Sequence, residues 1–346
     1  MSDRAPLVCI CVPTYNAETT IKEALGSILS QTYQNLKVIV FDNASTDRTV
    51  SIINSFKDNR LIVHQNNTNI GAAKNFNLCI ELSEGQYTAM FHADEIFEKE
   101  MVAKQVAILE SSSQVGAVFT EAYLIDGDSV IFGETKVAQY VGRRKGGTVV
   151  FDFKELFPKI VRYGNFLLCS GAMVRTAILK TEICFWDTDR FGTSCDLDVW
   201  LRVLEQHKIG VILEKLMRTR TTQTQLSFHE LRRNTNRADM FLVLDHYLEK
   251  YRSKGIVGTE DIDIYEALQR MDTSRRAMNF YLTARKENAK NLLVGMPVWD
   301  LVKFSFYSKR GLLTFFLVGY LKTVLLFGFD TLGVRILRLI AAKTKR

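Results

Sequence analysis

The first 110 residues alternate short apolar runs with helix-patterned segments, and this alternation limits the possible folds more than any other feature of the chain. Apolar runs predict buried strands at 7–12, 36–41, 61–64 and 87–91. Apolar side chains at helical spacing predict helices at 18–31, 47–56 and 71–83. Because hardly any hairpin signal separates these elements, the pattern predicts a doubly wound, mostly parallel sheet flanked by helices, an α/β fold.

The pattern changes along the rest of the chain. A helix is expected at 102–109 and a strand at 115–120, followed by an apolar segment at 166–174 and a helix at 198–206. From about residue 222 the pattern is helical, with the main pieces at 226–251 and 261–293. We therefore expect a catalytic domain at 1–225, a helical extension at 226–300 and an apolar, basic region at 301–346.

The net charge of +7 is concentrated at one end of the 346-residue chain. Residues 303–346 contain nine Lys/Arg and a single acid, Asp330. A nucleic-acid binder would instead spread its charge over a groove with interleaved aromatic residues. The distribution favours contact with anionic lipid and predicts no nucleic-acid partner.

The C-terminal region has the features of a membrane-contacting segment. Residues 312–329 are almost entirely apolar, but Lys322 lies near their centre, where a charge costs roughly 2.5–3.5 kcal/mol on insertion scales. Residues 332–340 place apolar side chains on one helical face and two arginines on the other. We expect helices that lie in the membrane interface; a spanning segment and a buried helical hairpin with a basic surface are the alternatives.

The cysteines and the N-terminus indicate the compartment. Six cysteines are scattered through the chain without CxxC or zinc-ligand spacing, as expected in a reducing environment. Residues 1–6 contain no apolar signal-peptide core. These features predict a cytoplasmic protein that is peripheral on the inner face of the cell membrane.

Polar residues follow the predicted strands at the sheet edge where such folds bind ligands. Asp42 ends the second strand and can bind the base and ribose of a nucleotide. Small residues in the segment 69–75 let a helix N-terminus approach a phosphate. The fourth strand ends in His92-Ala-Asp-Glu95, where a carboxylate can hold Mg²⁺ or Mn²⁺; a helix cap is the other reading of that Asp.

In order and spacing, these segments resemble the inverting glycosyltransferases of family 2, which have the Rossmann-like GT-A fold. The matching segments are Val12-Pro-Thr-Tyr-Asn16, Phe41-Asp-Asn-Ala-Ser-Thr-Asp47, Asn69-x-Gly-x-x-x-Asn75 and His92-Ala-Asp94. The resemblance implies that Asp94 binds the metal, although His92 replaces the family's first Asp. It also implies a nucleotide site formed by Pro13, Tyr15, Asn16, Asp42, Asn69, Gly71, Asn75, His92 and Ala93.

A further segment, Thr193-Ser-Cys-Asp-Leu-Asp-Val-Trp-Leu-Arg202, is similar to the family's segment that carries the catalytic base. By position the base is Asp196, and Asp198 starts a helix; alternatively, both are helix N-terminal acids. The resemblance places a phosphate-closing loop at 218–227, where Arg218 or Arg220 clamps the diphosphate, with a solvated basic loop as the alternative.

The sequence thus predicts transfer of a sugar from a nucleotide sugar to an acceptor hydroxyl with inversion. The basic tail implies an acceptor that is a lipid-linked glycan or a surface polysaccharide precursor. A non-catalytic sugar-nucleotide-binding or scaffold protein at the membrane is the main alternative. A nucleotidyltransferase is disfavoured, because residues 12–18 lack the glycine-rich loop that it needs.

Overall fold

The computed structural model describes residues 5–142, 146–221, 235–296 and 309–327. The chain divides into two compact units, Met1–Thr222 and Gln223–Arg346, which are considered separately below. The boundary predicted at residue 225 lies outside the described residues.

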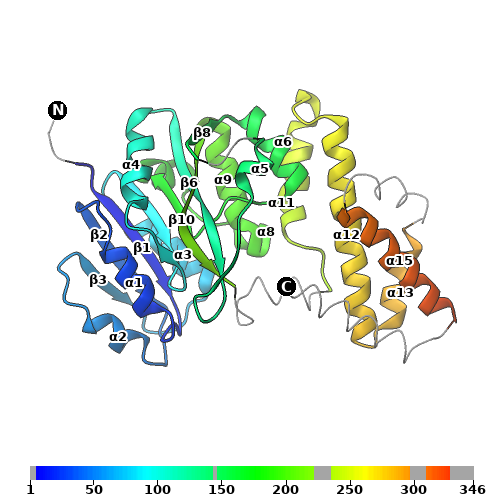
Figure 1. Ribbon diagram of the computed structural model, residues 1–346, viewed down its shortest axis with the longest axis horizontal. Coiled ribbons are helices and arrows are strands. Elements are labelled where there is room, and N and C mark those ends of the chain that lie inside the picture. Colours follow the sequence, from blue (N-terminus) through cyan, green and yellow to red (C-terminus); the bar gives the residue numbers. More distant parts are fainter. Residues whose placement is uncertain (1–4, 143–145, 222–234, 297–308, 328–346) are drawn as a thin grey trace. The chain divides into compact units, whose positions relative to one another are not determined.

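A ten-stranded mixed sheet forms the centre of the first unit (Figure 1). Its main path has the order β3-β2-β1-β4-β9-β6-β10-β5, while β7 pairs with β6 and β8 with β10. The strands are β1 Val8–Thr14, β2 Leu36–Asp42, β3 Leu61–Gln65, β4 Tyr87–Phe91, β5 Ile96–Phe97, β6 Val115–Ile125, β7 Ile131–Glu134, β8 Thr148–Phe151, β9 Gly171–Arg175 and β10 Lys208–Arg220.

The expected α/β fold is confirmed, and the sheet that was expected to be mostly parallel is mixed. Strands β1 to β4 pair in parallel, as the sequence predicts, and β6 pairs in parallel with β10. Strand β9, however, is antiparallel to both β4 and β6, and β5, β7 and β8 also pair antiparallel. Strand direction is set by the connections rather than by apolar periodicity, so the apolar segment around β9 does not reveal its orientation.

Helices flank this sheet. They are α1 Ile21–Leu29, α2 Thr49–Ser55, α3 Ala72–Leu82, α4 Met101–Ser111, α5 Val137–Tyr140, α6 Phe153–Tyr163, α7 Thr176–Ile178, α8 Thr188–Phe191 and α9 Cys195–Gln206. The alternating residues Val8, Ile10 and Val12 of β1 are fully buried in one core with residues of α1. Burial of each such side chain contributes roughly 1.5–3 kcal/mol to the free energy of folding. This core fixes the strand ends from which the candidate site is built.

Three polar loops meet at the carboxyl ends of β1, β2 and β4. Strand β9 runs in the opposite direction and pairs its first residue, Gly171, with Phe91, the last residue of β4. The segment that precedes Gly171 therefore reaches the same edge of the sheet. All six cysteines lie in the described part of the chain as free thiols, and Cys9 and Cys11 are buried in β1 as expected.

The second unit is helical in its described residues. Its longer helices are α11 Met240–Tyr251, α12 Thr259–Leu282, α13 Lys286–Val294 and α15 Lys309–Phe327. The single helix expected at 261–293 is interrupted at 283–285, where Ala284 has a φ of 61°. A core that includes Ala277, Leu293 and Leu321 joins α12, α13 and α15.

Lys322 does not stand alone in its apolar helix, because its ammonium donates a 2.7 Å hydrogen bond to the carbonyl of Met296. Among the helices that the structure describes, none combines the length and apolar composition that a membrane crossing requires. The amphipathic segment expected at 332–340 lies outside the described residues.

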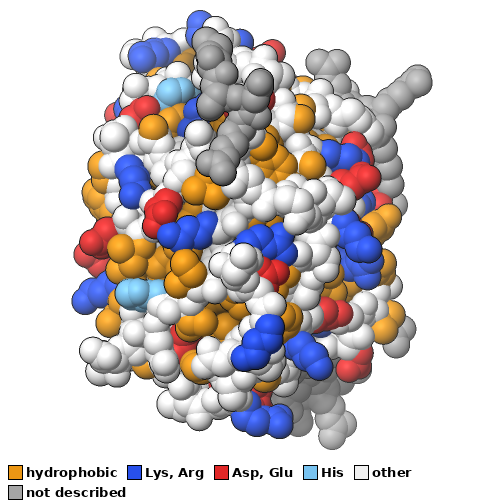
Figure 2. Space-filling model, turned by 90° about the vertical axis from the view of Figure 1, so that its left-hand side faces the viewer, with side chains coloured by type: hydrophobic (Ala, Val, Ile, Leu, Met, Phe, Trp, Pro, Cys, Tyr) orange, Lys and Arg blue, Asp and Glu red, His pale blue; other side chains and the backbone are white. Residues whose placement is uncertain are grey.

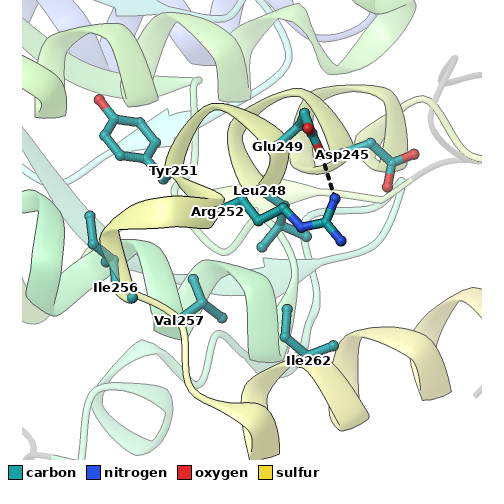
Figure 3. A pocket seen from close by; sticks show the side chains of 9 residues that line it. Asp245, Leu248, Glu249, Tyr251, Arg252, Ile256, Val257 and Ile262 are labelled. Carbon is teal, nitrogen blue, oxygen red and sulfur yellow. Dashed lines mark ion pairs between the residues drawn. The ribbon is translucent and has the colours of Figure 1, made fainter.

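The second unit also contains a cavity of about 580 Å³ beside α11 (Figure 3). Its polar side chains are already paired. Asp245 accepts 2.5 Å bonds from Arg237 and Tyr265, and Arg252 forms an ion pair with Glu249. We therefore interpret these groups as part of the packing of this unit.

The face in Figure 2 mixes basic, acidic and apolar side chains without a continuous basic stripe.

Candidate active site

The loops after β1 and β2 are tied together by hydrogen bonds through Asn16. Its backbone N–H donates to Ser45 Oγ at 2.9 Å, and its Oδ1 accepts from the backbone N–H of Thr46 at 2.9 Å. Asn16 has a left-handed φ of 46°, which asparagine tolerates better than most residues. Pro13 near the end of β1 is partly buried, whereas Tyr15 is 49% exposed on the joined loops. Tyr15 is thus placed where a ring could stack on a ligand.

Asp42 ends β2 and is completely buried. Its Oδ2 accepts a hydrogen bond from the backbone N–H of Ser45 at 3.1 Å. Its Oδ1 has no hydrogen-bond partner among the described residues. An unpaired buried acceptor costs about 1–3 kcal/mol. This oxygen is therefore suited to accept an N–H or O–H of a bound nucleoside.

An asparagine network shapes the loop before α3. Asn43 donates to Asn69 Oδ1 at 2.8 Å, and Asn66 donates to the Oδ1 atoms of Asn43 and Asn75 at 3.1 Å each. Asn75 also donates to the carbonyl of Phe41, and it is buried. The amide of Asn75 is thus bonded within the protein, and its expected contact with the nucleotide stays a prediction. The sequence alone assigns no role to Asn66 or to Asn43, although Asn43 lies in the segment 41–47.

Gly71 joins this network to α3. Its backbone N–H donates to Asn69 Oδ1 at 2.9 Å, and its φ of 85° is a conformation that glycine adopts without strain. Helix α3 starts at the next residue and has no side-chain cap, so its first N–H groups remain suited to a phosphate.

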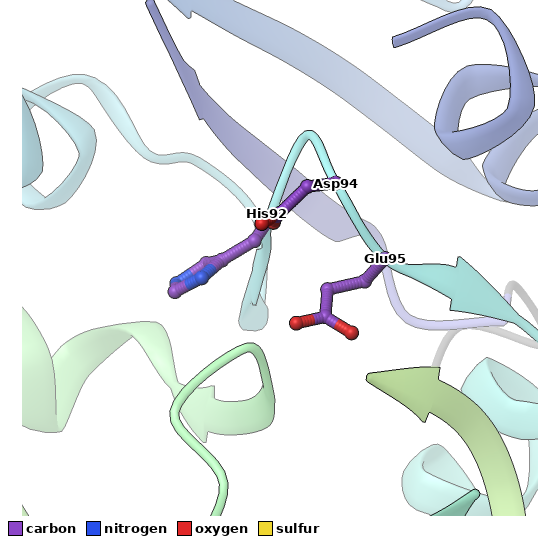
Figure 4. A group of neighbouring side chains, drawn as sticks. All are labelled: His92, Asp94 and Glu95. Atoms are coloured by element: carbon purple, nitrogen blue, oxygen red, sulfur yellow. The ribbon is translucent and has the colours of Figure 1, made fainter. Parts of the chain in front are cut away.

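His92, Asp94 and Glu95 project from the turn after β4 (Figure 4). One potential ligand atom from each lies within 4.8 Å of the others. Burial lowers the pKa of His92 in spite of the nearby Asp94 charge, which keeps the imidazole neutral. Its Nε2 is buried and has no hydrogen-bond partner in the described part of the chain. Ala93 between them is buried. A neutral imidazole next to a carboxylate fits a divalent cation.

Glu95 has a different role from its neighbours. Its Oε1 accepts from Thr219 Oγ1 at 2.8 Å and its Oε2 accepts from the backbone N–H of Arg220 at 3.1 Å. Burial, followed by the Asp94 charge, raises the pKa of Glu95 well above its usual range. We therefore assign Glu95 to anchoring the turn on β10, and Asp94 with His92 to the candidate metal site.

Arg218 and Arg220 do not lie in a loop, because both belong to β10. Arg218 pairs with Glu98 at 3.0 Å. Arg220 is only 5% exposed, and its guanidinium donates to the carbonyls of Asp94, Asp126 and Gly127 and to the carboxylate of Glu23. The structure thus corrects the expected loop position of both arginines and uses Arg220 to hold the Asp94 turn, while the phosphate clamp stays a prediction. The rest of the expected loop, 222–227, lies outside the described residues.

Asp196 lies in the first turn of α9 and is partly buried. Asn165 Nδ2 donates to its Oδ2 at 3.1 Å. Burial raises the pKa of Asp196 to about 6, although the N–H of Leu197 and the Asn165 amide oppose this shift. Its carboxylate is thus ionised at neutral pH and is basic enough to accept a proton.

Asp198 is in a different environment. It is 4% exposed and accepts from Arg202 at 2.8 Å, while Arg202 also donates to the carbonyls of Ile183 and Phe185. Helix α9 begins at Cys195, three residues before the expected start. Asp198 is therefore part of an ion pair, whereas Asp196 bonds Asn165 and has a raised pKa.

Aromatic contacts connect the Asp94 turn to α9. His92 packs on Phe76 with ring centroids 5.5 Å apart, and Phe76 packs on Trp186 at 5.2 Å. Trp186 in turn contacts Trp200 of α9 at 5.8 Å. Trp200 is fully buried. Phe76 and Trp186 were missed, because single aromatic residues read from sequence as ordinary core.

Known proteins resemble this chain in sequence and in fold. Residues 9–154 match the model of glycosyl transferase family 2. The chain is similar to an Escherichia coli UDP-Glc:alpha-D-GlcNAc-diphosphoundecaprenol beta-1,3-glucosyltransferase, WfaP: 27% identity over 200 residues, covering 58% of this chain and 71% of that protein.

Two solved structures share the fold. One is S. aureus TarS 1–349 in complex with UDP-GlcNAc, with a TM-score of 0.52 and 18% identity, covering 83% of this chain and 90% of that one. The other is the mannosyltransferase PcManGT of Pyrobaculum calidifontis in complex with GDP-Man and Mn²⁺, with a TM-score of 0.50 and 16% identity, covering 94% and 88%.

Proposed function

We propose that the protein transfers a sugar from a nucleoside-diphosphate sugar to an acceptor hydroxyl with inversion at the anomeric carbon, as the match of residues 9–154 to the model of glycosyl transferase family 2 supports. The placement of Asp196 carries this proposal. A partly buried carboxylate with a pKa of about 6 is held by Asn165, and aromatic contacts from Trp200 through Trp186 and Phe76 link its helix to His92. A protein that only bound sugar nucleotides would have no use for such a base.

The donor binds across the carboxyl ends of β1, β2 and β4. The unpaired Oδ1 of Asp42 accepts a hydrogen bond from the base or ribose, and Tyr15 lies beside it on the exposed loops. The N-terminus of α3 after Gly71 favours the diphosphate through its uncapped N–H groups and helix dipole. That TarS and PcManGT were solved with UDP-GlcNAc and with GDP-Man supports a nucleoside diphosphate at this position.

Asp94, together with His92, would hold a divalent cation, Mg²⁺ or Mn²⁺. Such an ion supplies Lewis-acid neutralisation of the charge that develops on the leaving diphosphate. The Mn²⁺ in the PcManGT structure supports this assignment, as does the unpaired, neutral His92. The chain's own contribution is to fix the turn: Glu95 and Arg220 tie it to β10, so that Asp94 is already in position before substrate arrives.

Asp196 acts as the general base. Its carboxylate takes the proton of the acceptor hydroxyl while that oxygen forms its bond to the anomeric carbon and the bond to the diphosphate breaks. A single displacement of this kind inverts the anomeric centre. Asn165 orients the carboxylate and favours its ionised form, so that Asp196 accepts the proton at neutral pH.

We further propose a lipid-linked glycan or a polysaccharide precursor as the acceptor, at the cytoplasmic face of a membrane. The lipid-linked substrate in the name of the E. coli relative supports this acceptor class. The nine basic residues and single acid of 303–346 support contact with an anionic membrane surface.

The donor can be identified by a thermal-shift screen. Purified protein is tested against UDP-, GDP- and dTDP-sugars with Mn²⁺, with and without EDTA, and donor hydrolysis is followed in parallel. A bound donor raises the melting temperature by mass action. Stabilisation with turnover supports a transferase, whereas stabilisation without any hydrolysis or transfer supports the non-catalytic binding protein.

A further inference from the structure

We propose that Tyr163, stacked on Tyr140, is the platform on which a sugar ring of the acceptor lies beside Asp196. The inference rests on the proposed function, since Asp196 as base must meet the acceptor hydroxyl. It goes further by naming the ligand of an aromatic surface that the donor site does not use.

The platform has a defined geometry. The rings of Tyr140 and Tyr163 are stacked with centroids 4.8 Å apart and an interplanar angle of 18°. Tyr140 also packs on Phe166, with centroids 5.7 Å apart, and Phe166 is 8% exposed. Tyr163 is therefore supported on one face by the partly buried ring of Tyr140, which in turn packs on the buried Phe166, and yet Tyr163 remains 42% exposed. A large aromatic side chain that is held rigidly at the surface is suited to contact a ligand.

The chain connects this ring to the base. Tyr163 is the last residue of α6, and Gly164 follows with a φ of 81°, which reverses the chain at once. Asn165 comes next and bonds Asp196 at 3.1 Å. Because two residues span at most about 7 Å, the Tyr163 backbone lies close to the residue that orients the base.

The position in the sheet agrees with an acceptor rather than a donor contact. The loop that contains Asn165 leads into β9, whose first residue pairs with the last residue of β4, so it reaches the edge that carries Asp94. The donor groups, Asp42 and the start of α3, lie on the far side of β4 along the strand order β3-β2-β1-β4-β9. Tyr163 is on the β9 side, two residues before Asn165, which bonds Asp196.

The chemistry points to a carbohydrate. A pyranose presents one face of C–H groups with partial positive charge, and this face packs on the negative face of an aromatic ring. The hydroxyl groups at the ring edge then remain available to the base. Loss of such a contact is expected to weaken acceptor binding about 3- to 10-fold.

The test uses the full chain with UDP and Mn²⁺ and, as probes, the methyl glycosides of glucose, galactose, mannose and N-acetylglucosamine. Saturation-transfer NMR reports binding of these glycosides without any need for turnover. The variants are Tyr163→Ala and Tyr163→Phe. Phe132→Ala is the matched control, because Phe132 is also an exposed aromatic residue of the first unit, at 58% exposure.

We expect wild type, Tyr163→Phe and Phe132→Ala to transfer saturation to at least one glycoside, and Tyr163→Ala to lose about 3- to 10-fold in affinity for it. Equal binding by Tyr163→Ala, or no glycoside bound by wild type, overturns the platform. Donor hydrolysis measured without acceptor distinguishes a failure of the acceptor platform from a failure of the proposed function. It should be the same in Tyr163→Ala and wild type, and its absence from wild type would count against the proposed function instead.

Discussion

The amide nitrogen of Asn165 lies 3.1 Å from Oδ2 of Asp196 and donates a hydrogen bond to it. Asn165 is itself fixed, because its Oδ1 accepts from the backbone N–H of Leu167 at 3.1 Å. The carboxylate is thus held by a side chain that cannot rotate freely. Burial and this bond act in opposite directions on the pKa of Asp196, and the result is a value of about 6.

Replacing Asn165 should shift the pH dependence of the reaction. Burial raises the pKa of Asp196 and the hydrogen bond from Asn165 lowers it. Because Asn165→Ala removes that hydrogen bond, the pKa of Asp196 should rise above about 6. A general base works when ionised, so kcat/KM rises with pH through this pKa, and the variant's rise should move to higher pH. The pH profile of kcat/KM checks this. The variant should lose more activity at pH 6 than at pH 8, and an unmoved profile would remove Asn165 from this role.

Asp94 should be needed for metal-dependent donor binding. In Asp94→Ala the carboxylate that neutralises the cation is absent, so both donor stabilisation by Mn²⁺ and turnover should be lost. His92→Asp supplies a second carboxylate and should leave activity intact or improve it. Thermal shift with donor, Mn²⁺ and EDTA measures binding independently of turnover. Metal-dependent activity near wild type in Asp94→Ala would show that the ligand is elsewhere.

Arg220 should stabilise the folded protein and the Asp94 turn more than Arg218 does. Arg220→Gln removes a buried guanidinium that bonds the carbonyls of Asp94, Asp126 and Gly127, at a cost of about 1–3 kcal/mol in the free energy of unfolding. Arg218→Gln is the matched control, because its more exposed pair with Glu98 is worth only about 0.2–1 kcal/mol. Urea unfolding of both variants measures the difference. Equal losses would contradict the anchoring role.

The C-terminal region should determine membrane association. A chain that lacks residues 328–346 should move to the soluble fraction and keep donor hydrolysis, because this deletion keeps the core of α12, α13 and α15 and the candidate site lies in the first unit. High salt or an alkaline wash should extract the full-length protein, since electrostatic attraction at a membrane surface is screened by salt. Retention of the full-length protein after the alkaline wash would favour a spanning segment.

The sequence predicts the first half of the sheet well, because the core residues of β1 to β4 make continuous apolar runs that end in polar motifs. It also selects Asp42, Asp94 and Asp196 as candidate site residues, since each occurs inside a recognisable segment. It fails for residues whose role arises from contacts across the fold. No local sequence pattern reveals the antiparallel direction of β9 or the hydrogen bond from Asn165 to Asp196. The two neighbouring arginines suggest a phosphate contact, whereas Arg220 in the structure is a buried anchor for the Asp94 turn.

Asp196→Asn will also report on folding, and this separates chemistry from stability. The pKa of Asp196 is raised from 3.8 to about 6 in the folded protein, so its ionisation opposes folding as the pH rises through this range. The neutral amide removes that cost, and Asp196→Asn should be no less stable than wild type at pH 8. Asp198→Asn breaks the ion pair with Arg202 and should lose about 1.5–3 kcal/mol.

The most direct test of the account is the turnover number of Asp196→Asn compared with that of Asp198→Asn, at saturating donor and pH 8. Without its proton acceptor, Asp196→Asn should lose about 10²–10⁴-fold in kcat, while donor affinity stays nearly unchanged. Asp198→Asn, once folded, should turn over at close to the wild-type rate. An active Asp196→Asn beside an inactive Asp198→Asn would contradict the assignment and make Asp198 the base.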